Sequence, residues 1–266
     1  MCASNTTSAR DLVVEFAARG QYHFSSSEFR TALGVSVAAA NQALWRLAKR
    51  GEIASPGRGF YVVVPPEYRA LGCLPPDQFI PALMDHRSIP YYAGLLSAAQ
   101  YHGAAHHRPQ VFQVMVDKSR PPISCGAVRV DFISRAGLAD VPLCTFDNPR
   151  GTIAASTVEA TAVDLVGYMD RAGGVDRVAG MLSELSEQMD PVLLVDAVRS
   201  APALWAQRLG FLLEFVGAGQ VCAPLRDHVG QSGRNYTKLL PSASAQGAAR
   251  SRDWRLLVNA PIEVEA

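Results

Sequence analysis

The sequence predicts a protein of the α+β class that folds as two domains. A chain of 266 residues is longer than one domain usually needs. Apolar residues recur at helical spacing in the first fifty positions, and a β-hairpin pattern follows as far as Val64. Farther along the chain, strand patterns and helix patterns both occur. We therefore expect a winged helix-turn-helix domain over 1–66, a connector over 67–76 and a larger mixed α/β domain over 77–266.

The first part of this pattern predicts two short helices. Apolar residues at helical spacing indicate a helix over 5–20, which ends at a glycine. Ser25 and Glu28 have the spacing of a capping box, and Phe24 and Phe29 stand where a hydrophobic staple places its two members. A second helix is therefore expected to begin at this serine.

The third helix has two distinct faces, and Ser36 is its expected N-cap. One face is apolar and should pack on the first two helices. Its expected members are Val37, Ala40, Leu44, Leu47 and Ala48. The opposite face is small, polar and basic, which suits the major groove of DNA, where Gln favours adenine and Arg favours guanine. Its members are Ala38, Ala39, Gln42, Trp45, Arg46 and Lys49, with Asn41 and Arg50 at the margins.

A hairpin pattern follows this basic helix directly. Two strand-like stretches, 52–55 and 60–64, flank the turn signal Pro56-Gly57-Arg58-Gly59. A basic residue at the tip of such a hairpin is typical of a wing that contacts DNA. Two alternatives remain open, a helix whose charged face is only solvated and a winged domain used only for protein contacts. The predicted DNA-binding residues are Ser36, Ala38, Gln42, Trp45, Arg46, Lys49, Arg50 and Arg58.

The larger domain mixes helices and strands. A stretch of small and apolar residues after Pro90 predicts a buried helix over 91–101. The terminal stretch Trp254–Asn259 reads as a strand that rejoins the earlier sheet. The other expected strands are 111–116, 128–133 and 143–146, and the other expected helices are 77–86, 157–169, 174–188, 191–199 and 202–216.

Composition narrows the possible functions. Hydrophobic residues make up 48% of the chain and charged residues 18%, which is typical of a globular protein. A net charge of +1 provides no global basic field, so any contact with nucleic acid has to be local. Five scattered cysteines without a C-x-x-C pair indicate free thiols in a reducing compartment. We find no signal-peptide pattern and no apolar run of membrane-spanning length, and therefore expect a cytoplasmic protein without membrane contact.

Two groups of residues could form a metal or catalytic site, but each group lacks part of the pattern that such a site requires. His102 and His106 are four residues apart and His107 follows, but no carboxylate or cysteine completes a metal shell. Asp117 and Asp131 lie on candidate adjacent strands, without the spacing of a nuclease core or the Gly-Ser and Asp-x-Asp signature of a nucleotidyltransferase. We therefore expect no catalytic residue, no metal site and no cofactor, and predict that the protein is not an enzyme.

Four stretches, taken in order, resemble the AbiEi family of antitoxins and transcriptional regulators from type IV toxin–antitoxin systems. They are the winged region Phe24–Val64, the segment Pro90–Gly103, the helix Ser156–Val166 and the terminal Trp254–Asn259. Each stretch alone is weakly specific. Their order and spacing along nearly the full chain carry the resemblance.

The resemblance implies an antitoxin with two functions. The winged domain would bind inverted repeats in its own promoter through the third helix and Arg58, and so repress the operon. The C-terminal domain would counteract a nucleotidyltransferase toxin without forming a stable complex. The alternative function is a ligand-responsive winged-helix transcription regulator with a small-molecule pocket in the C-terminal domain, which the apolar stretch 91–101 motivates.

Overall fold

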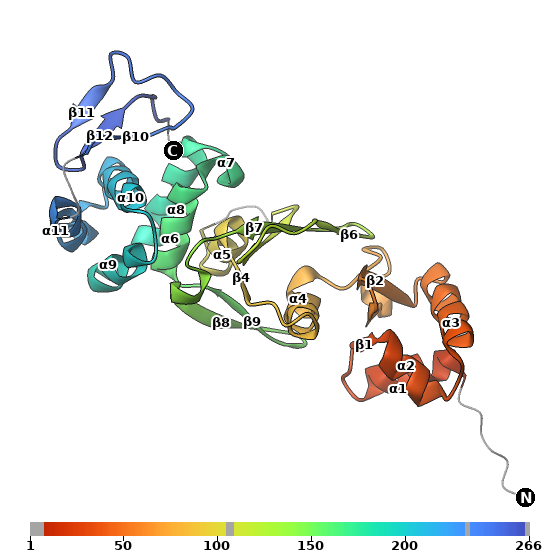
Figure 1. Ribbon diagram of the computed structural model, residues 1–266. Coiled ribbons are helices and arrows are strands. Elements are labelled where there is room, and N and C mark those ends of the chain that lie inside the picture. Colours follow the sequence, from red (N-terminus) through yellow and green to blue (C-terminus); the bar gives the residue numbers. More distant parts are fainter. Residues whose placement is uncertain (1–7, 105–108, 232–234, 264–266) are drawn as a thin grey trace, which may run out of the picture. The chain divides into compact units, whose positions relative to one another are not determined.

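The computed structural model describes residues 8–104, 109–231 and 235–263 (Figure 1). The described residues form helices, an antiparallel sheet and mixed sheets, and the predicted α+β class, with a winged N-terminal domain and a larger C-terminal domain, is confirmed. Within the described ranges, no helix has both the length and the apolar character needed to cross a membrane.

The chain divides into two compact units that are each built from separate segments. The first unit holds the described residues up to Pro90, together with 120–132 and 146–153. The second unit holds the other described residues. The strands β7 (Val128–Ser134), β8 (Leu143–Asn148) and β9 (Gly151–Ser156) contribute residues to both units.

Three helices and a three-stranded sheet form the N-terminal part of the first unit. The sheet has the order β1-β3-β2, with both pairs antiparallel. Phe24, Phe29 and Leu44 lie in the core that the helices and the sheet share. The elements are α1 (Ala9–Ala18), β1 (His23–Ser25), α2 (Ser26–Leu33), α3 (Val37–Lys49), β2 (Ile53–Gly57) and β3 (Phe60–Val63).

The predicted start of α2 is confirmed. The Ser25 side chain accepts a hydrogen bond from the Glu28 N–H at 3.1 Å, and the Glu28 carboxylate accepts one from the Ser25 N–H at 2.6 Å. These two bonds form a capping box. The rings of Phe24 and Phe29 stack with centroids 5.6 Å apart. At the other end of α2, the C-cap residue Gly34 lies in the left-handed region with φ 66°.

The apolar face of α3 differs in part from the prediction. Ala40, Leu44 and Leu47 are buried as expected. Val37 is 55% exposed and Ala48 is exposed, so both predictions were wrong. Ala43 is buried in addition, because the core-facing stripe of the helix is centred on positions 40, 43, 44 and 47. Val37 and Ala48, at the two ends of the helix, lie beyond the surface that the core covers.

The wing hairpin is tighter than the sequence predicted. Gly57 pairs with Phe60, so Pro56 and Gly57 belong to β2 and the turn consists of Arg58 and Gly59. Gly59 has a φ of 73°, a conformation that glycine adopts without strain. A register shift between Ala54 and Gly57 marks an irregularity in β2.

The rest of the first unit contacts both the winged part and the segment that follows the wing. The Ala127 N–H donates to the Leu71 carbonyl at 2.8 Å. The Arg150 guanidinium lies 3.3 Å from the centre of the Tyr22 ring. The additional elements of this unit are the 3₁₀ turn η1 (Pro66–Tyr68), the helix α4 (Pro76–His86) and the strand β6 (Ile123–Cys125).

A six-stranded mixed sheet has the order β6-β7-β5-β4-β9-β8, where β4 is Tyr91–Ala93 and β5 is Phe112–Val116. The pair β4–β5 is antiparallel and the pair β4–β9 is parallel. The expected helix over 91–101 is therefore wrong in its first part, because these residues enter the sheet. The helix α5 begins only at Leu95 and ends at Tyr101.

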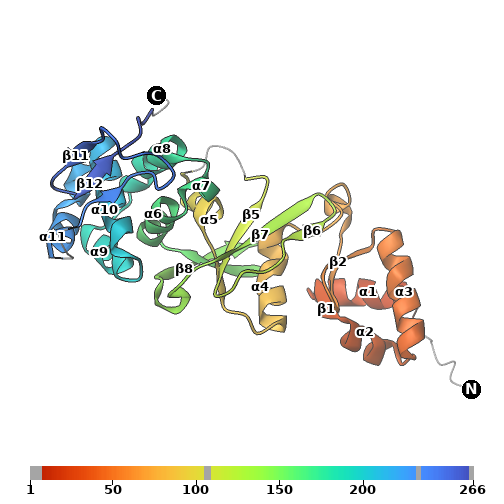
Figure 2. The ribbon, with the colours of Figure 1, turned by 45° about the horizontal axis from the view of Figure 1, so that its top comes forward.

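Helices dominate the second unit. In both ribbon views α6 lies among α8, α9 and α10 (Figures 1 and 2), and these helices share one core with Trp254. The predicted cap of α6 by Thr157 is confirmed. The helical elements are α6 (Val158–Gly167), α7 (Met169–Ala172), α8 (Val175–Ser186), α9 (Pro191–Arg199), α10 (Ala203–Phe215) and α11 (Ala223–Gln231), with 3₁₀ turns η2 (Leu138–Asp140) and η3 (Gly219–Val221).

The predicted place of the last strand was wrong. β12 (Leu256–Val258) pairs with β10 (Thr237–Lys238) and β11 (Ala249–Ser251) in a separate three-stranded sheet, instead of rejoining the larger one. Trp254, just before β12, is fully buried, and its ring N–H donates to the Glu214 carboxylate of α10 at 2.6 Å.

Candidate nucleic-acid interface

The outer face of α3 carries one continuous stripe of exposed side chains. Its residues follow the spacing i, i+4, i+7, i+8 and i+11, which places them on one side of a helix. Trp45, at the centre of the stripe, is 63% exposed. The members of the stripe are Ala38, Gln42, Trp45, Arg46 and Lys49.

Local contacts orient both ends of this stripe. The Ser36 side-chain oxygen accepts the Ala39 N–H at 3.3 Å and caps the helix. The Lys49 ammonium lies 5.1 Å from the centre of the Trp45 ring, within cation–π range. Arg50 is the C-terminal cap residue, and its side chain is exposed.

The cations of α3 and the wing turn have no carboxylate partner in the part of the chain that the structure describes. Among the described residues, no carboxylate lies within salt-bridge distance of Arg46, Lys49 or Arg58. The nearby pair Arg10–Glu52, at 3.4 Å, involves neither α3 nor the wing turn. The positive charges on α3 and the wing are therefore available to an external anion.

The structure places all eight predicted site residues in the first unit and leaves all of them exposed. Seven lie on α3 or at its two ends, and Arg58 occupies the turn of the wing. This arrangement can present amide, aromatic and guanidinium groups to base edges and to phosphates.

The sequence prediction missed a second basic site beside the wing. Arg87, at the end of α4, and Arg120 line a polar cavity of about 330 Å³ together with Pro56 of β2. These residues are far apart in sequence, so no local pattern could have brought them together.

The other candidate residues lie on or beside separate elements where the structure describes them. His102 has its ring Nε2 2.8 Å from the Ser156 carbonyl, while His106 and His107 lie outside the described residues. Asp131 lies in β7, and Asp117 follows β5. Across the described ranges, no group of three His, Cys, Asp or Glu side chains could hold a metal ion.

The cysteines that the structure describes are free thiols, as predicted, and Cys2 lies outside the described residues. Cys73 and Cys125 are close enough for a thiol–thiol hydrogen bond, which raises the pKa of Cys73 and lowers that of Cys125. Neither thiol faces a metal cluster among the described residues.

The second unit holds a buried charged network. Arg135 is 2% exposed and Asp164 is fully buried, and the Arg135 Nε donates to the Asp164 carboxylate at 2.8 Å. The Tyr92 hydroxyl donates to the same carboxylate at 2.6 Å, and the Arg135 guanidinium lies 5.0 Å from the centre of the Trp205 ring. Burial, followed by the Asp164 charge, raises the pKa of Tyr92. This network joins parts of the core and has no exposed reactive group.

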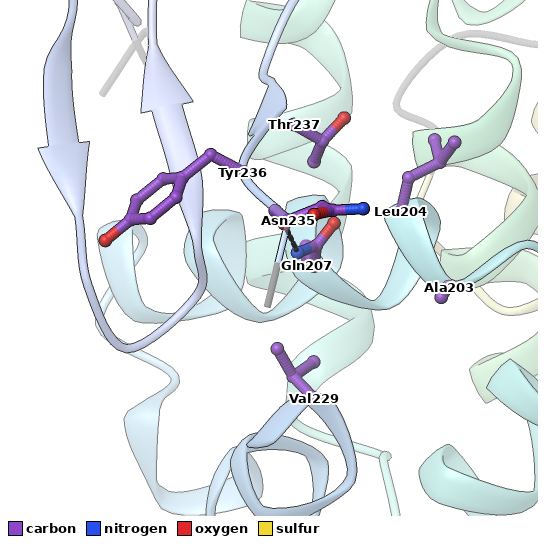
Figure 3. Close-up of a pocket in the computed structure, with 7 residues that line it drawn as sticks. All are labelled: Ala203, Leu204, Gln207, Val229, Asn235, Tyr236 and Thr237. Atoms are coloured by element: carbon purple, nitrogen blue, oxygen red, sulfur yellow. Dashed lines mark hydrogen bonds between the residues drawn. The ribbon is translucent and has the colours of Figure 1, made fainter. Parts of the chain in front are cut away.

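A cavity of about 330 Å³ opens in the second unit near the small sheet (Figure 3). Gln207 of α10 donates its side-chain N–H to the Asn235 carbonyl at 3.1 Å on one side of it. The apolar stretch 91–101, which motivated a ligand pocket, does not line this cavity. Its lining residues are Ala203, Leu204, Gln207, Val229, Asn235, Tyr236 and Thr237.

Comparisons with known proteins define the class of this chain. Residues 11–64, which hold the three helices and the wing, match the family model "Transcriptional regulator, AbiEi antitoxin". Residues 92–215 match the model "AbiEi antitoxin C-terminal domain". The chain is thus a regulator with a winged N-terminal domain. It belongs to the AbiEi antitoxin family.

One solved structure shares the fold over most of the chain. The crystal structure of the RV2827C protein from Mycobacterium tuberculosis is 16% identical, with a TM-score of 0.67, and the match covers 94% of this chain and 90% of that one. No curated protein matches the chain.

Proposed function

We propose that this protein is a DNA-binding antitoxin that represses its own operon through the winged helix and counteracts a nucleotidyltransferase toxin through its C-terminal domain. The DNA-binding part of the proposal is supported by the exposed stripe on α3, followed by Arg58 in the wing. Among the described residues, Arg46 and Lys49 of this stripe have no carboxylate partner. Both matched family models describe antitoxins, which supports a role in a toxin–antitoxin system.

The physical basis of operator binding is a local basic surface. The net charge of +1 gives the whole protein little attraction for DNA. Cations on α3 and the wing would contact phosphates, and Gln42 and Arg46 would reach base edges in the major groove. Specificity would then depend on two or three side chains of one helix.

A mobility-shift titration tests operator binding. The full chain is titrated into the duplex upstream of its own gene and into a shuffled duplex of equal length, with the salt concentration held fixed. We expect a shift of the upstream duplex at concentrations roughly a thousandfold lower than for the shuffled duplex, as is typical of a specific binder. Equal affinity for both would contradict operator binding.

The antitoxin part is tested by growth rescue. The full chain is expressed together with the product of the neighbouring gene, expected to be a nucleotidyltransferase. We expect growth to be restored by the wild type and also by Arg46→Ala/Lys49→Ala, because the C-terminal domain would neutralise the toxin without DNA and without a stable complex. Rescue that fails with the double variant would contradict this division of functions.

The second candidate function is a ligand-responsive regulator. The cavity beside α10, with amide groups from Gln207 and Asn235, is the observation that favours it. A thermal-shift screen followed by DNA release would test it. A ligand that raises the melting temperature of the wild type, does not raise that of Gln207→Leu, and releases DNA would favour this function over the antitoxin function.

A further inference from the structure

A polar cavity lies directly beside the wing of the first unit. Pro56 of β2 forms one wall, and residues 121–124 form another. Arg87 and Arg120 contribute the charged groups of the lining. Among the described residues that line the cavity, none carries a carboxylate.

Arg87 is held against the backbone of the wing. It is the C-terminal cap residue of α4, and its N–H donates to the Leu83 carbonyl at 3.2 Å. A Cβ atom added to Gly57 would lie 2.5 Å from the Arg87 Nη2, so the guanidinium end of Arg87 lies directly against the backbone of β2 at this point. Gly57 immediately precedes Arg58, the exposed residue of the wing turn.

The cavity concentrates positive charge. Burial, followed by the charge of Arg120, lowers the pKa of Arg87. In the described part of the chain no carboxylate pairs with Arg87. Ser124 adds a hydroxyl donor to the same wall. Guanidinium groups are suited to bind phosphate oxygens with two parallel hydrogen bonds, and a bound anion would relieve the repulsion between the two arginines.

We propose that Arg87 and Arg120 bind a phosphate of the DNA backbone next to the wing. This inference rests on the proposed binding of DNA by α3 and Arg58. A wing that enters or borders a groove of the duplex places its flanks against the sugar–phosphate backbone, and this cavity lies on such a flank. The contact fixes the protein on the duplex and reads no bases.

Fluorescence anisotropy of the full chain with a labelled upstream duplex, over a range of salt concentrations, tests the proposal. We expect Arg87→Gln/Arg120→Gln to weaken binding roughly tenfold and, because one phosphate contact is lost, to reduce the salt slope by about 1. The loss should be equal for upstream and shuffled duplexes, because a phosphate contact carries no sequence information. The matched control, Arg177→Gln/Arg252→Gln, removes two exposed arginines of the second unit and should change neither quantity.

A conservative variant shows whether a loss of binding comes from unfolding of the protein. Arg87→Lys keeps the charge and loses the planar fork, so we expect a smaller loss of affinity and an unchanged salt slope. Thermal unfolding of each variant shows whether it is folded. If Arg87→Gln/Arg120→Gln does not fold, an unchanged affinity for Arg87→Lys overturns the proposal and a reduced one supports it.

The remaining outcomes separate the possible failures. If Arg46→Ala/Lys49→Ala abolishes binding while Arg87→Gln/Arg120→Gln binds like the wild type, this inference fails and the proposed function stands. If the wild type binds no duplex, both fail. A free anion is the other source of phosphate. Suppose that inorganic phosphate raises the melting temperature of the wild type but not that of Arg87→Gln/Arg120→Gln, while the two proteins have the same salt slope for DNA binding. The cavity would then bind a free anion, and the proposal would be overturned.

Discussion

Two arginine sites, one in each compact unit, differ in burial and in pairing. In the second unit Arg135 is buried and paired with Asp164 at 2.8 Å. In the first unit Arg46 and Arg58 are exposed and have no carboxylate partner among the described residues. The buried pair is needed for the stability of the fold, because a buried charge without its partner is strongly unfavourable. The exposed arrangement contributes little to folding and leaves the charge for a ligand.

The largest expected effect is on the buried pair. Asp164→Ala should lower the free energy of unfolding by about 3–5 kcal/mol, because it leaves the Arg135 guanidinium buried without its counter-ion. Urea unfolding of the full chain measures this. Asp196→Ala, which removes an exposed partner of Arg199, is the control and should change stability by less than about 1 kcal/mol. Similar losses for both variants would contradict a special role for the buried pair.

The wing arginine should show the reverse behaviour. Arg58→Ala removes an exposed cation that has no carboxylate partner among the described residues, so stability should stay within about 0.5 kcal/mol of the wild type. Affinity for the upstream duplex should fall roughly tenfold, and the salt slope should fall by about 1. Anisotropy titrations at several salt concentrations check this. A stable variant with an unchanged salt slope would remove the wing from the interface.

A smaller effect is expected at the start of α2. Ser25→Ala removes the side-chain oxygen that accepts the Glu28 N–H and should reduce stability by about 1 kcal/mol. Thr31→Ala, an exposed position on the same helix, is the control and should stay within about 0.5 kcal/mol. Equal effects of the two substitutions would show that the cap contributes nothing in this context.

The smallest effect is a pH dependence in the same capping box. Hydrogen bonds from the Ser25 N–H and side chain lower the pKa of Glu28 below its ordinary value of 4.5. An acid with a lowered folded-state pKa stabilises the protein above its unfolded-state pKa, and this contribution is lost as the pH falls through the folded-state value. Urea unfolding between pH 3 and pH 6 should therefore be less pH-dependent for Glu28→Gln than for the wild type. Identical pH profiles would contradict this.

Much of the first unit could be predicted from the sequence because its signals are local. The starts of two helices are indicated by capping residues within a few positions of each start, namely Ser25, Glu28 and Ser36. The apolar face of α3 was predicted less well at its ends, where Val37 and Ala48 are exposed. Burial at the ends of the helix depends on how far the neighbouring elements extend. The helical spacing of apolar residues gives no information about that extent.

The second unit was harder to predict because its strands pair over long distances. The stretch Tyr91–Ala93 is short and apolar, and such a run fits a buried helix or a buried strand equally well. The partner of Leu256 was likewise undetermined, because strand order is a tertiary property. The pairing of Arg135 with Asp164, and the approach of Arg87 to Gly57, depend on folding in the same way.

The candidate site was predicted as one side of the third helix together with Arg58 of the wing, and the structure leaves that whole set exposed. DNA binding by these residues remains a prediction. These residues could be predicted from the sequence because residues four apart lie on the same side of a helix. A binding stripe on a single helix can therefore be recognised without tertiary information.

The most direct test of this account is the affinity of the full chain for its upstream duplex, measured by anisotropy for the wild type and for Arg46→Ala/Lys49→Ala. If α3 is the DNA-binding helix, the double variant should have the unfolding midpoint of the wild type, bind at least roughly tenfold more weakly, and have a salt slope smaller by about 1 to 2. A folded double variant with wild-type affinity and salt slope would contradict the assignment of α3 as the DNA-binding helix.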